Sequence, residues 1–209
     1  MQRDPFATGE YYHIFNRGTD KRKIFSTSSD YKRFINSMIR FNTTIPSWKM
    51  DDQVEVQPRL EDQLVDIAAY CLNPNHFHFI LRQKKDSGIS EFMRKLGTGY
   101  TMYFNKINSR TGVLFQGRFK SVHINSNEYL LYLSAYVNCN NDIHEISSAK
   151  NYAWTSFGEY CGKESGPIGC YTNDILGQFK NFREYEDFAL IQAKEMKNKK
   201  EEMRGMHLE

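Results

Sequence analysis

The spacing of hydrophobic residues along the chain predicts four β-strands. Gly9–Asn16, Leu64–Leu72, His76–Arg82 and Val113–Ile124 are rich in aromatic or β-branched residues and are bounded by turn-forming residues. Asn73-Pro74-Asn75 separates the second strand from the third, and its turn chemistry predicts a hairpin.

Three helices are predicted between and after these strands. Tyr31, Phe34, Ile35, Met38 and Ile39 recur at three- and four-residue steps, which indicates an amphipathic helix capped at Ser28 or Ser29. A second helix is predicted over Ser90–Ile107, and a third from about Ser126 to Asn140. The order β-α-β-β-α-β predicts an α+β fold of the ferredoxin-like type, an antiparallel sheet with helices on one face, followed by the third helix and a C-terminal extension.

The remaining segments suggest how the domain is bounded. Asp51–Asp66 carries six acidic residues against one arginine and contains Pro58, which favours an exposed connection. From Gln192 onward Lys, Glu and Met dominate, so we expect a solvated helix or a disordered tail. We therefore predict one domain over residues 1–160 and a partly helical or disordered extension over residues 161–209.

Composition excludes several classes of protein. The 209 residues are 40% hydrophobic and 14% aromatic, too apolar for a disordered or low-complexity chain. The apolar runs are too short for a membrane span, and Met1-Gln2-Arg3-Asp4 does not open a signal peptide, so we expect a cytoplasmic protein without a membrane partner. The four cysteines form no CxxC pair and predict reduced thiols rather than a zinc ribbon or a disulfide scaffold.

The net charge of +3 is small, but the basic residues are unevenly distributed. The segment from Phe92 to Lys120 has six basic residues and no acidic ones, interleaved with Tyr and Phe. Proteins that bind single-stranded nucleic acid combine basic groups for phosphates with rings that stack on bases. A solvated helix followed by a strand with core aromatics is the alternative interpretation.

Two histidines in the third strand are the first candidates for chemistry. Side chains alternate between the faces of a strand, so His76 and His78 share one face, whereas Phe77, Phe79 and Leu81 share the other. Their backbones would lie about 6.5–7 Å apart, close enough for the two imidazoles to bind one divalent ion. Ordinary hydrogen-bonded histidines are the alternative.

Several segments together resemble a known family. Asn73–Phe79 resembles the metal-binding motif of HUH nucleases, in which two histidines flank a hydrophobic residue on a central strand of a ferredoxin-like sheet. Tyr12–Gly18, Gly112–Lys120 and Trp154–Phe157 look like segments of the REP-associated tyrosine transposases, which are related to the single-tyrosine insertion-sequence transposases. The resemblance spans roughly residues 9–160 and implies that residues 1–160 form a single-tyrosine HUH catalytic domain.

The family places its nucleophilic tyrosine on the helix after the fourth strand, where this chain has Tyr129, Tyr132 and Tyr136. At about 100° per residue the three share one wedge of the helix, so periodicity cannot select among them. The segment Tyr136-Val137-x-x-Asn140 is similar to the family's tyrosine segment, which implies that Tyr136 is the nucleophile and Asn140 a third metal ligand. The family usually has proline after this asparagine, whereas this chain has Asn141, so the end of the helix is expected to differ.

The resemblance implies a metal-dependent single-stranded DNA endonuclease and strand transferase, a transposase-like enzyme that cleaves beside DNA hairpins through a 5′-phosphotyrosine intermediate. Two imidazoles with oxygen ligands suit Mg²⁺ or Mn²⁺, although they would also accept zinc. We predict phosphate contacts from five basic residues, four of them in the acid-free segment, with solvated surface charges as the alternative: Arg17, Arg94, Lys95, Arg118 and Lys120.

Two other functions remain open at this stage. A ferredoxin-like sheet also binds single strands without cutting them, so the chain could be a non-catalytic binding protein derived from a transposase. A hydrolytic nuclease could use the same histidines without a tyrosine. The sequence does not decide whether a monomer or a homodimer forms the site.

Overall fold

The computed structural model describes residues 5–46, 59–163 and 166–206, and it contains one four-stranded antiparallel sheet. The strands follow the spatial order β2-β3-β1-β4. They are β1 (Tyr11–Arg17), β2 (Val65–Asn73), β3 (His76–Gln83) and β4 (Lys120–Ile124). The predicted α+β fold with its antiparallel sheet and helices is confirmed.

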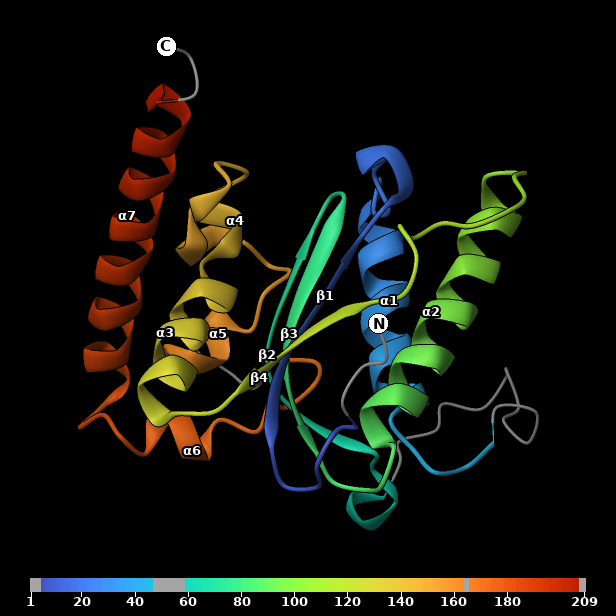
Figure 1. Cartoon of the computed structure of the whole chain (residues 1–209), viewed down its shortest axis with the longest axis horizontal. Coiled ribbons are helices and arrows are strands. Elements are labelled where there is room, and N and C mark those ends of the chain that lie inside the picture. The colour runs from blue at the N-terminus through green and yellow to red at the C-terminus, as the bar shows by residue number, and fades with distance from the viewer. Residues whose placement is uncertain (1–4, 47–58, 164–165, 207–209) are drawn as a thin grey trace.

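Helices cover both faces of this sheet (Figure 1). On one face lie α1 (Ser28–Phe41) and α2 (Gly88–Ile107), the two helices expected from the split β-α-β unit. On the other face lie α3 (Asn127–Asn138), α4 (Asn140–Ile143), α5 (Phe157–Tyr160) and α7 (Phe182–Met206), with α6 (Asn173–Leu176) beside them. Short 3-10 turns occur at Thr19–Lys21, Leu60–Asp62 and Ala149–Asn151.

The alternation in β3 divides its side chains between the two layers as predicted. Phe77, Phe79 and Leu81 are buried in the cluster that α1 and α2 complete. Ile80 belongs to the second cluster, which contains residues of α3, α5 and α7. His76 and His78 therefore face the α3 layer, because they alternate with the phenylalanines.

Element boundaries differ from the predictions where tertiary contacts decide them. Residues 113–119 do not extend β4, and within them Phe115 forms only an isolated bridge to Gly18. The cap of α1 is Thr27, one residue before the predicted positions, and it forms a capping box with Asp30. Of the segment predicted to be an exposed connection, residues 51–58 lie outside the described part of the chain. The prediction is wrong for Asp66, a buried residue of β2 that pairs with Arg82.

The C-terminal extension packs on the domain over much of its described length. In α7, Tyr185, Ala189 and Ala193 are buried against the α3 layer. The Tyr185 hydroxyl accepts a hydrogen bond from Asn138 at 2.8 Å. The described part of the extension is thus partly helical, and its long helix α7 contributes an apolar stripe to the second core. Among the described residues, no helix is long and apolar enough to cross a membrane.

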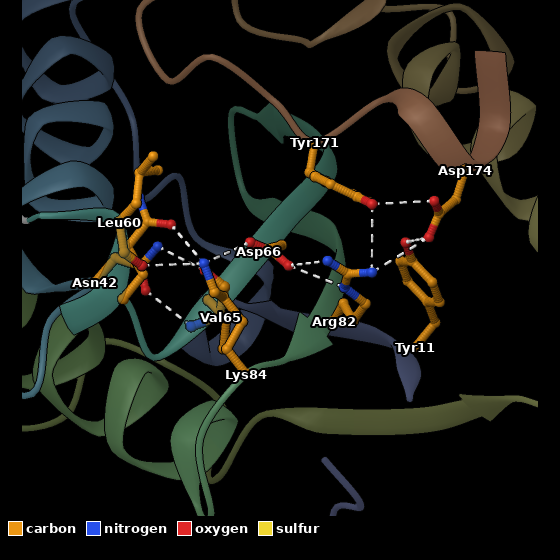
Figure 2. Close-up of polar contacts among 10 residues, drawn as sticks. Tyr11, Asn42, Leu60, Val65, Asp66, Arg82, Lys84, Tyr171 and Asp174 are labelled. Carbon is orange, nitrogen blue, oxygen red and sulfur yellow. Dashed lines mark hydrogen bonds and ion pairs between the residues drawn. The ribbon is translucent and has the colours of Figure 1, made fainter. Parts of the chain in front are cut away.

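A polar network joins α6 to three strands of the sheet (Figure 2). Arg82 of β3 donates to Asp66 at 2.6 Å and lies 3.4 Å from Asp174 of α6. Asp174 also accepts hydrogen bonds from the Tyr11 and Tyr171 hydroxyls, at 2.6 and 3.1 Å. The network fixes the C-terminal segment at the end of the sheet opposite His76.

Asn42, which follows α1, holds the start of β2 (Figure 2). Its side-chain oxygen accepts from the backbone amides of Leu64 and Val65, both at 3.0 Å, and its amide donates to the Val65 carbonyl at 2.8 Å. Asn42→Ala leaves these buried backbone groups unsatisfied and is expected to cost about 2–3 kcal/mol of unfolding free energy. Urea unfolding should show a lower midpoint with an unchanged m-value.

Asn36→Ala is the matched control, because Asn36 is an exposed asparagine of α1, the helix that Asn42 follows. It should change stability by no more than about 0.5 kcal/mol. Equal effects of the two substitutions would contradict the assignment of a structural role to Asn42.

Candidate active site

His76 and His78 lie side by side on the face of β3 that α3 and α4 cover. Their ring centroids are 5.2 Å apart and their planes are perpendicular, at 90°. His78 is 7% exposed, and His76 is half-buried. Burial lowers the pKa of both imidazoles, and the neighbouring His13 adds to the effect at His78. Both rings are therefore neutral at pH 7, the form in which imidazole binds a metal.

Asparagine side chains orient His76. The Nδ1 atom of His76 lies 2.7 Å from the Asn75 side-chain oxygen. Because that oxygen can only accept, Nδ1 carries the ring proton and Nε2 keeps its lone pair. Asn73 donates to this lone pair at 3.0 Å and to the Asn140 side-chain oxygen at 2.7 Å.

The donor set around His76 fits a divalent ion. Nε2 of His76 and the side-chain oxygen of Asn140 are both acceptors, yet they lie 3.2 Å apart. The Asn73 amide donates to both, and a cation in its place would be bound by the same two lone pairs. His78 would supply a second imidazole. Within the described residues no group of three His, Cys, Asp or Glu side chains could hold a metal ion. The predicted ligand set is of a different kind, since it consists of two histidines and an amide.

Of the three candidate tyrosines, Tyr136 lies against the histidines. Its ring meets that of His78 edge-on at 5.4 Å and that of His13 at 5.9 Å. Tyr129 packs half-buried in the second core cluster, and Tyr132 is 41% exposed. Burial raises the pKa of the Tyr136 phenol, and the Asn140 side chain opposes that shift. The phenol is thus protonated at neutral pH.

The helix that carries Tyr136 is interrupted just before Asn140. It stops at Asn138, and Cys139 separates it from α4, which Asn140 begins. Ser126, the predicted start, caps α3 by accepting from the amide of Tyr129 at 3.1 Å. The interruption leaves Asn140 fully buried against β2 and β3, facing His76.

Sequence reasoning missed His13 and His144 as neighbours of the site. Nε2 of the buried His13 lies 2.9 Å from Nδ1 of His78, and burial lowers the pKa of His13 to about 4. The exposed His144 packs edge-on against His76 at 5.1 Å, and its Nδ1 lies 3.1 Å from Lys200 of α7. The alternation of β1 places the His13 side chain on the face of the sheet that Tyr12 and Ile14 do not share. Only the pairing of β1 with β3 brings His13 next to His78.

The predicted phosphate contacts are divided between the two faces of the sheet. Arg17 pairs with His76 and Lys120 with Phe15 across the strands, so the side chains of both lie on the histidine face. Both are exposed. Arg94 and Arg118 are also exposed, and they line a cavity on the opposite face.

The structure contradicts the predicted role of Lys95, which is 2% exposed. Its ammonium donates to the carbonyls of Thr43 and Ile45 at 2.6 and 2.9 Å and pairs with Glu91 at 2.9 Å. A lysine with all three donors occupied inside the protein has none left for a phosphate.

The cavity next to α2 has a volume of about 1200 Å³. Its lining includes apolar side chains and the two arginines: Phe77, Leu96, Phe115, Phe119, Arg94 and Arg118. It therefore combines apolar walls with positive charge.

The chain is similar in sequence to one protein family and in fold to solved structures. Residues 7–140, which include both histidines, Tyr136 and Asn140, match the family described as IS200-like transposases. The fold is similar to that of the REP-associated tyrosine transposase bound to a REP hairpin, with a TM-score of 0.55 and 14% identity over 81% of this chain and 89% of that one. At that identity the similarity establishes the fold alone. No curated protein sequence matches the chain.

Proposed function

The chain belongs to the IS200-like transposase family, and we propose that it cleaves and rejoins single-stranded DNA through Tyr136 with a bound divalent metal ion. The observation that carries the proposal is the packing of the Tyr136 ring against His78, 5.4 Å between centroids, beside the convergent acceptors of His76 and Asn140. A nucleophile next to a metal-binding set is the arrangement that phosphoryl transfer requires.

His76, His78 and Asn140 would hold the ion, for which Mg²⁺ and Mn²⁺ suit the amide oxygen and the oxygens of substrate and water. When bound, the ion polarises a phosphate oxygen and makes the phosphorus more electrophilic. The Tyr136 hydroxyl attacks that phosphorus, forms a 5′-phosphotyrosine bond and loses its proton. The bond to the 3′-oxygen breaks, and that oxygen leaves as a 3′-hydroxyl after gaining a proton.

The protonated state of Tyr136 explains why the metal ion would have to activate the phosphate. Burial raises the pKa of the phenol, so the unliganded site holds a weak nucleophile. The phosphotyrosine bond preserves the energy of the phosphodiester. A second 3′-hydroxyl can therefore attack it and rejoin strands without ATP.

We propose single-stranded DNA beside a hairpin as the substrate. The structural neighbour is bound to a REP hairpin, which supports a hairpin partner for this chain. Arg17 and Lys120 on the histidine face would contact phosphates near the site. The cavity with Arg94 and Arg118 would receive unpaired bases of the flank, because its phenylalanine walls suit stacking.

Neutralising Arg17 and Lys120 tests the DNA path. If each contacts one phosphate of a single strand, Arg17→Gln/Lys120→Gln should make the slope of log affinity against log salt shallower by about 1.4. Sequence preference should change little, because phosphate contacts position a strand without reading it. Fluorescence anisotropy of a hairpin with a single-stranded flank, titrated at several salt concentrations, measures both quantities.

Lys32→Gln/Lys194→Gln is the matched control, since it removes the same charge from exposed positions on the outer surfaces of α1 and α7. Its slope should equal that of the parent. A parent-like slope for the Arg17/Lys120 variant would exclude these residues from the DNA path.

The function itself is tested by a covalent complex of protein and DNA. Labelled DNA incubated with the protein and Mn²⁺ should yield a species that survives denaturing electrophoresis, and EDTA should prevent it. Cleavage without this species would indicate a hydrolytic nuclease. Binding without cleavage would indicate a non-catalytic protein.

A further inference from the structure

We propose that His13 of β1 is a positioning residue that holds His78 in the one tautomer able to bind a metal ion. This inference rests on the proposed function, because it assumes that His78 is a metal ligand. His13 comes from a different strand and lies outside the two-histidine motif of β3.

The pairing of β1 with β3 places the two rings together. Phe15 lies opposite His78 and His13 opposite Ile80, so His13 and His78 are diagonal neighbours on one face of the sheet. Their rings are stacked, with centroids 5.1 Å apart and planes inclined by 19°. Nε2 of His13 lies 2.9 Å from Nδ1 of His78, a good hydrogen-bond distance.

Water does not compete for this hydrogen bond. His13 is 6% exposed and His78 is 7% exposed. The Tyr136 ring closes the site from the α3 side, edge-on to both imidazoles. A hydrogen bond enclosed in this way fixes the proton positions more firmly than one at the surface.

The direction of the hydrogen bond decides whether His78 can bind an ion. If Nδ1 of His78 donates to His13, Nε2 of His78 keeps a lone pair and is the only ring nitrogen left for a metal. If His13 donates instead, the proton of a neutral His78 must lie on Nε2, and the ring has no free lone pair. Metal binding therefore selects the state in which His13 accepts.

His76 has a partner that fixes its ring proton in the way proposed here for His78. The Asn75 side chain accepts from Nδ1 of His76 and leaves Nε2 as the acceptor that faces Asn140. His13 would do for His78 what Asn75 does for His76. Partners of this kind fix the tautomer and the ring orientation of metal ligands, and their removal costs about 10- to 100-fold in metal affinity.

Two substitutions separate positioning from simple space filling. The amide of glutamine reaches approximately the place of Nε2 in histidine, so His13→Gln can accept the proton of His78. His13→Asn carries the same amide on a side chain one methylene shorter and cannot reach it. His123→Asn is the control, because His123 is an exposed histidine whose ring contacts Tyr12 on the opposite face of the sheet.

Two measurements on the full chain without DNA provide the readouts. Long-range ¹⁵N–¹H NMR of the metal-free protein reports which nitrogen of His78 is protonated, and Mn²⁺ titration followed by EPR reports affinity. In the parent and in His13→Gln, His78 should carry its proton on Nδ1. In His13→Asn the Nε2-protonated form should become populated, and Mn²⁺ affinity should fall about 10- to 100-fold, while His13→Gln stays within about threefold of the parent.

The outcomes distinguish this inference from the proposed function. A parent that binds Mn²⁺, together with a His13→Asn variant of unchanged affinity, would overturn the role of His13 and leave the proposed function intact. A loss of affinity without a change of tautomer would also overturn it, since that result indicates general loosening. A parent that binds no Mn²⁺ at His78 would overturn the proposed metal site, and with it the inference.

Discussion

Tyr136→Phe is expected to abolish the covalent complex between protein and DNA while leaving DNA binding intact. The substitution removes only the hydroxyl that we propose as the nucleophile. The ring still fills its place against His13 and His78. Removing the nucleophile of a covalent enzyme typically lowers the rate by several orders of magnitude, so we expect a loss of at least about 10³-fold. Electrophoresis of labelled DNA under denaturing conditions measures the complex, and anisotropy measures binding.

Tyr132→Phe and Tyr129→Phe are matched controls on the same helix. Tyr132 lies one turn before Tyr136 and is 41% exposed, and Tyr129 packs in the second core cluster. Both variants should form the complex at the parental rate. If the complex persists in Tyr136→Phe and disappears in either control, the nucleophile has been assigned to the wrong tyrosine.

His76→Ala is expected to have the second largest effect. It removes the imidazole whose Nε2 faces the Asn140 oxygen, so the remaining ligands should bind Mn²⁺ more than about 100-fold more weakly. No covalent complex should form at Mn²⁺ concentrations that saturate the parent. Because His76 is only half-buried, the unfolding free energy of the metal-free protein should stay within about 1–2 kcal/mol of the parent.

Substituting His76 tests metal binding with less disturbance of the structure than substituting His78. His78 is buried, and its loss would also remove the hydrogen-bond partner of His13. His123→Ala should bind Mn²⁺ and form the complex like the parent, since His123 lies on the other face of the sheet. Crystals soaked in Mn²⁺ whose anomalous signal lies away from His76 and His78 would contradict the assignment.

The histidine face could be predicted from the sequence because it depends on local geometry alone. Strict alternation in residues 76–81 places the histidines and the phenylalanines on different faces, whichever strands lie beside this one. The turn Asn73-Pro74-Asn75 joins β2 to β3 in a hairpin. The order of helices and strands along the chain also followed from local signals, since each element carries its own periodicity. The resemblance added Tyr136, which the helical wheel could not separate from Tyr132.

Other features depend on contacts between distant segments and were missed or mispredicted. His13 reaches His78 only through the register of β1 on β3. Lys95 belongs to a basic segment, yet the chain that follows α1 presents two carbonyls to its ammonium and buries it. Asp66 continues an acidic segment, but Arg82 of the neighbouring strand and Lys84, just after that strand, neutralise it. In each case the partner lies far away in the sequence.

The most direct test of the account is to identify the residue that becomes linked to DNA. After reaction with Mn²⁺ and a hairpin carrying a single-stranded flank, the protein is digested with trypsin and nuclease. The peptide Ser121–Lys150 contains Tyr129, Tyr132 and Tyr136, so fragment ions are needed to locate the modification. We expect a 5′-nucleotide on Tyr136, formed only with metal present. A nucleotide on another residue, or efficient cleavage without any linked peptide, would contradict it.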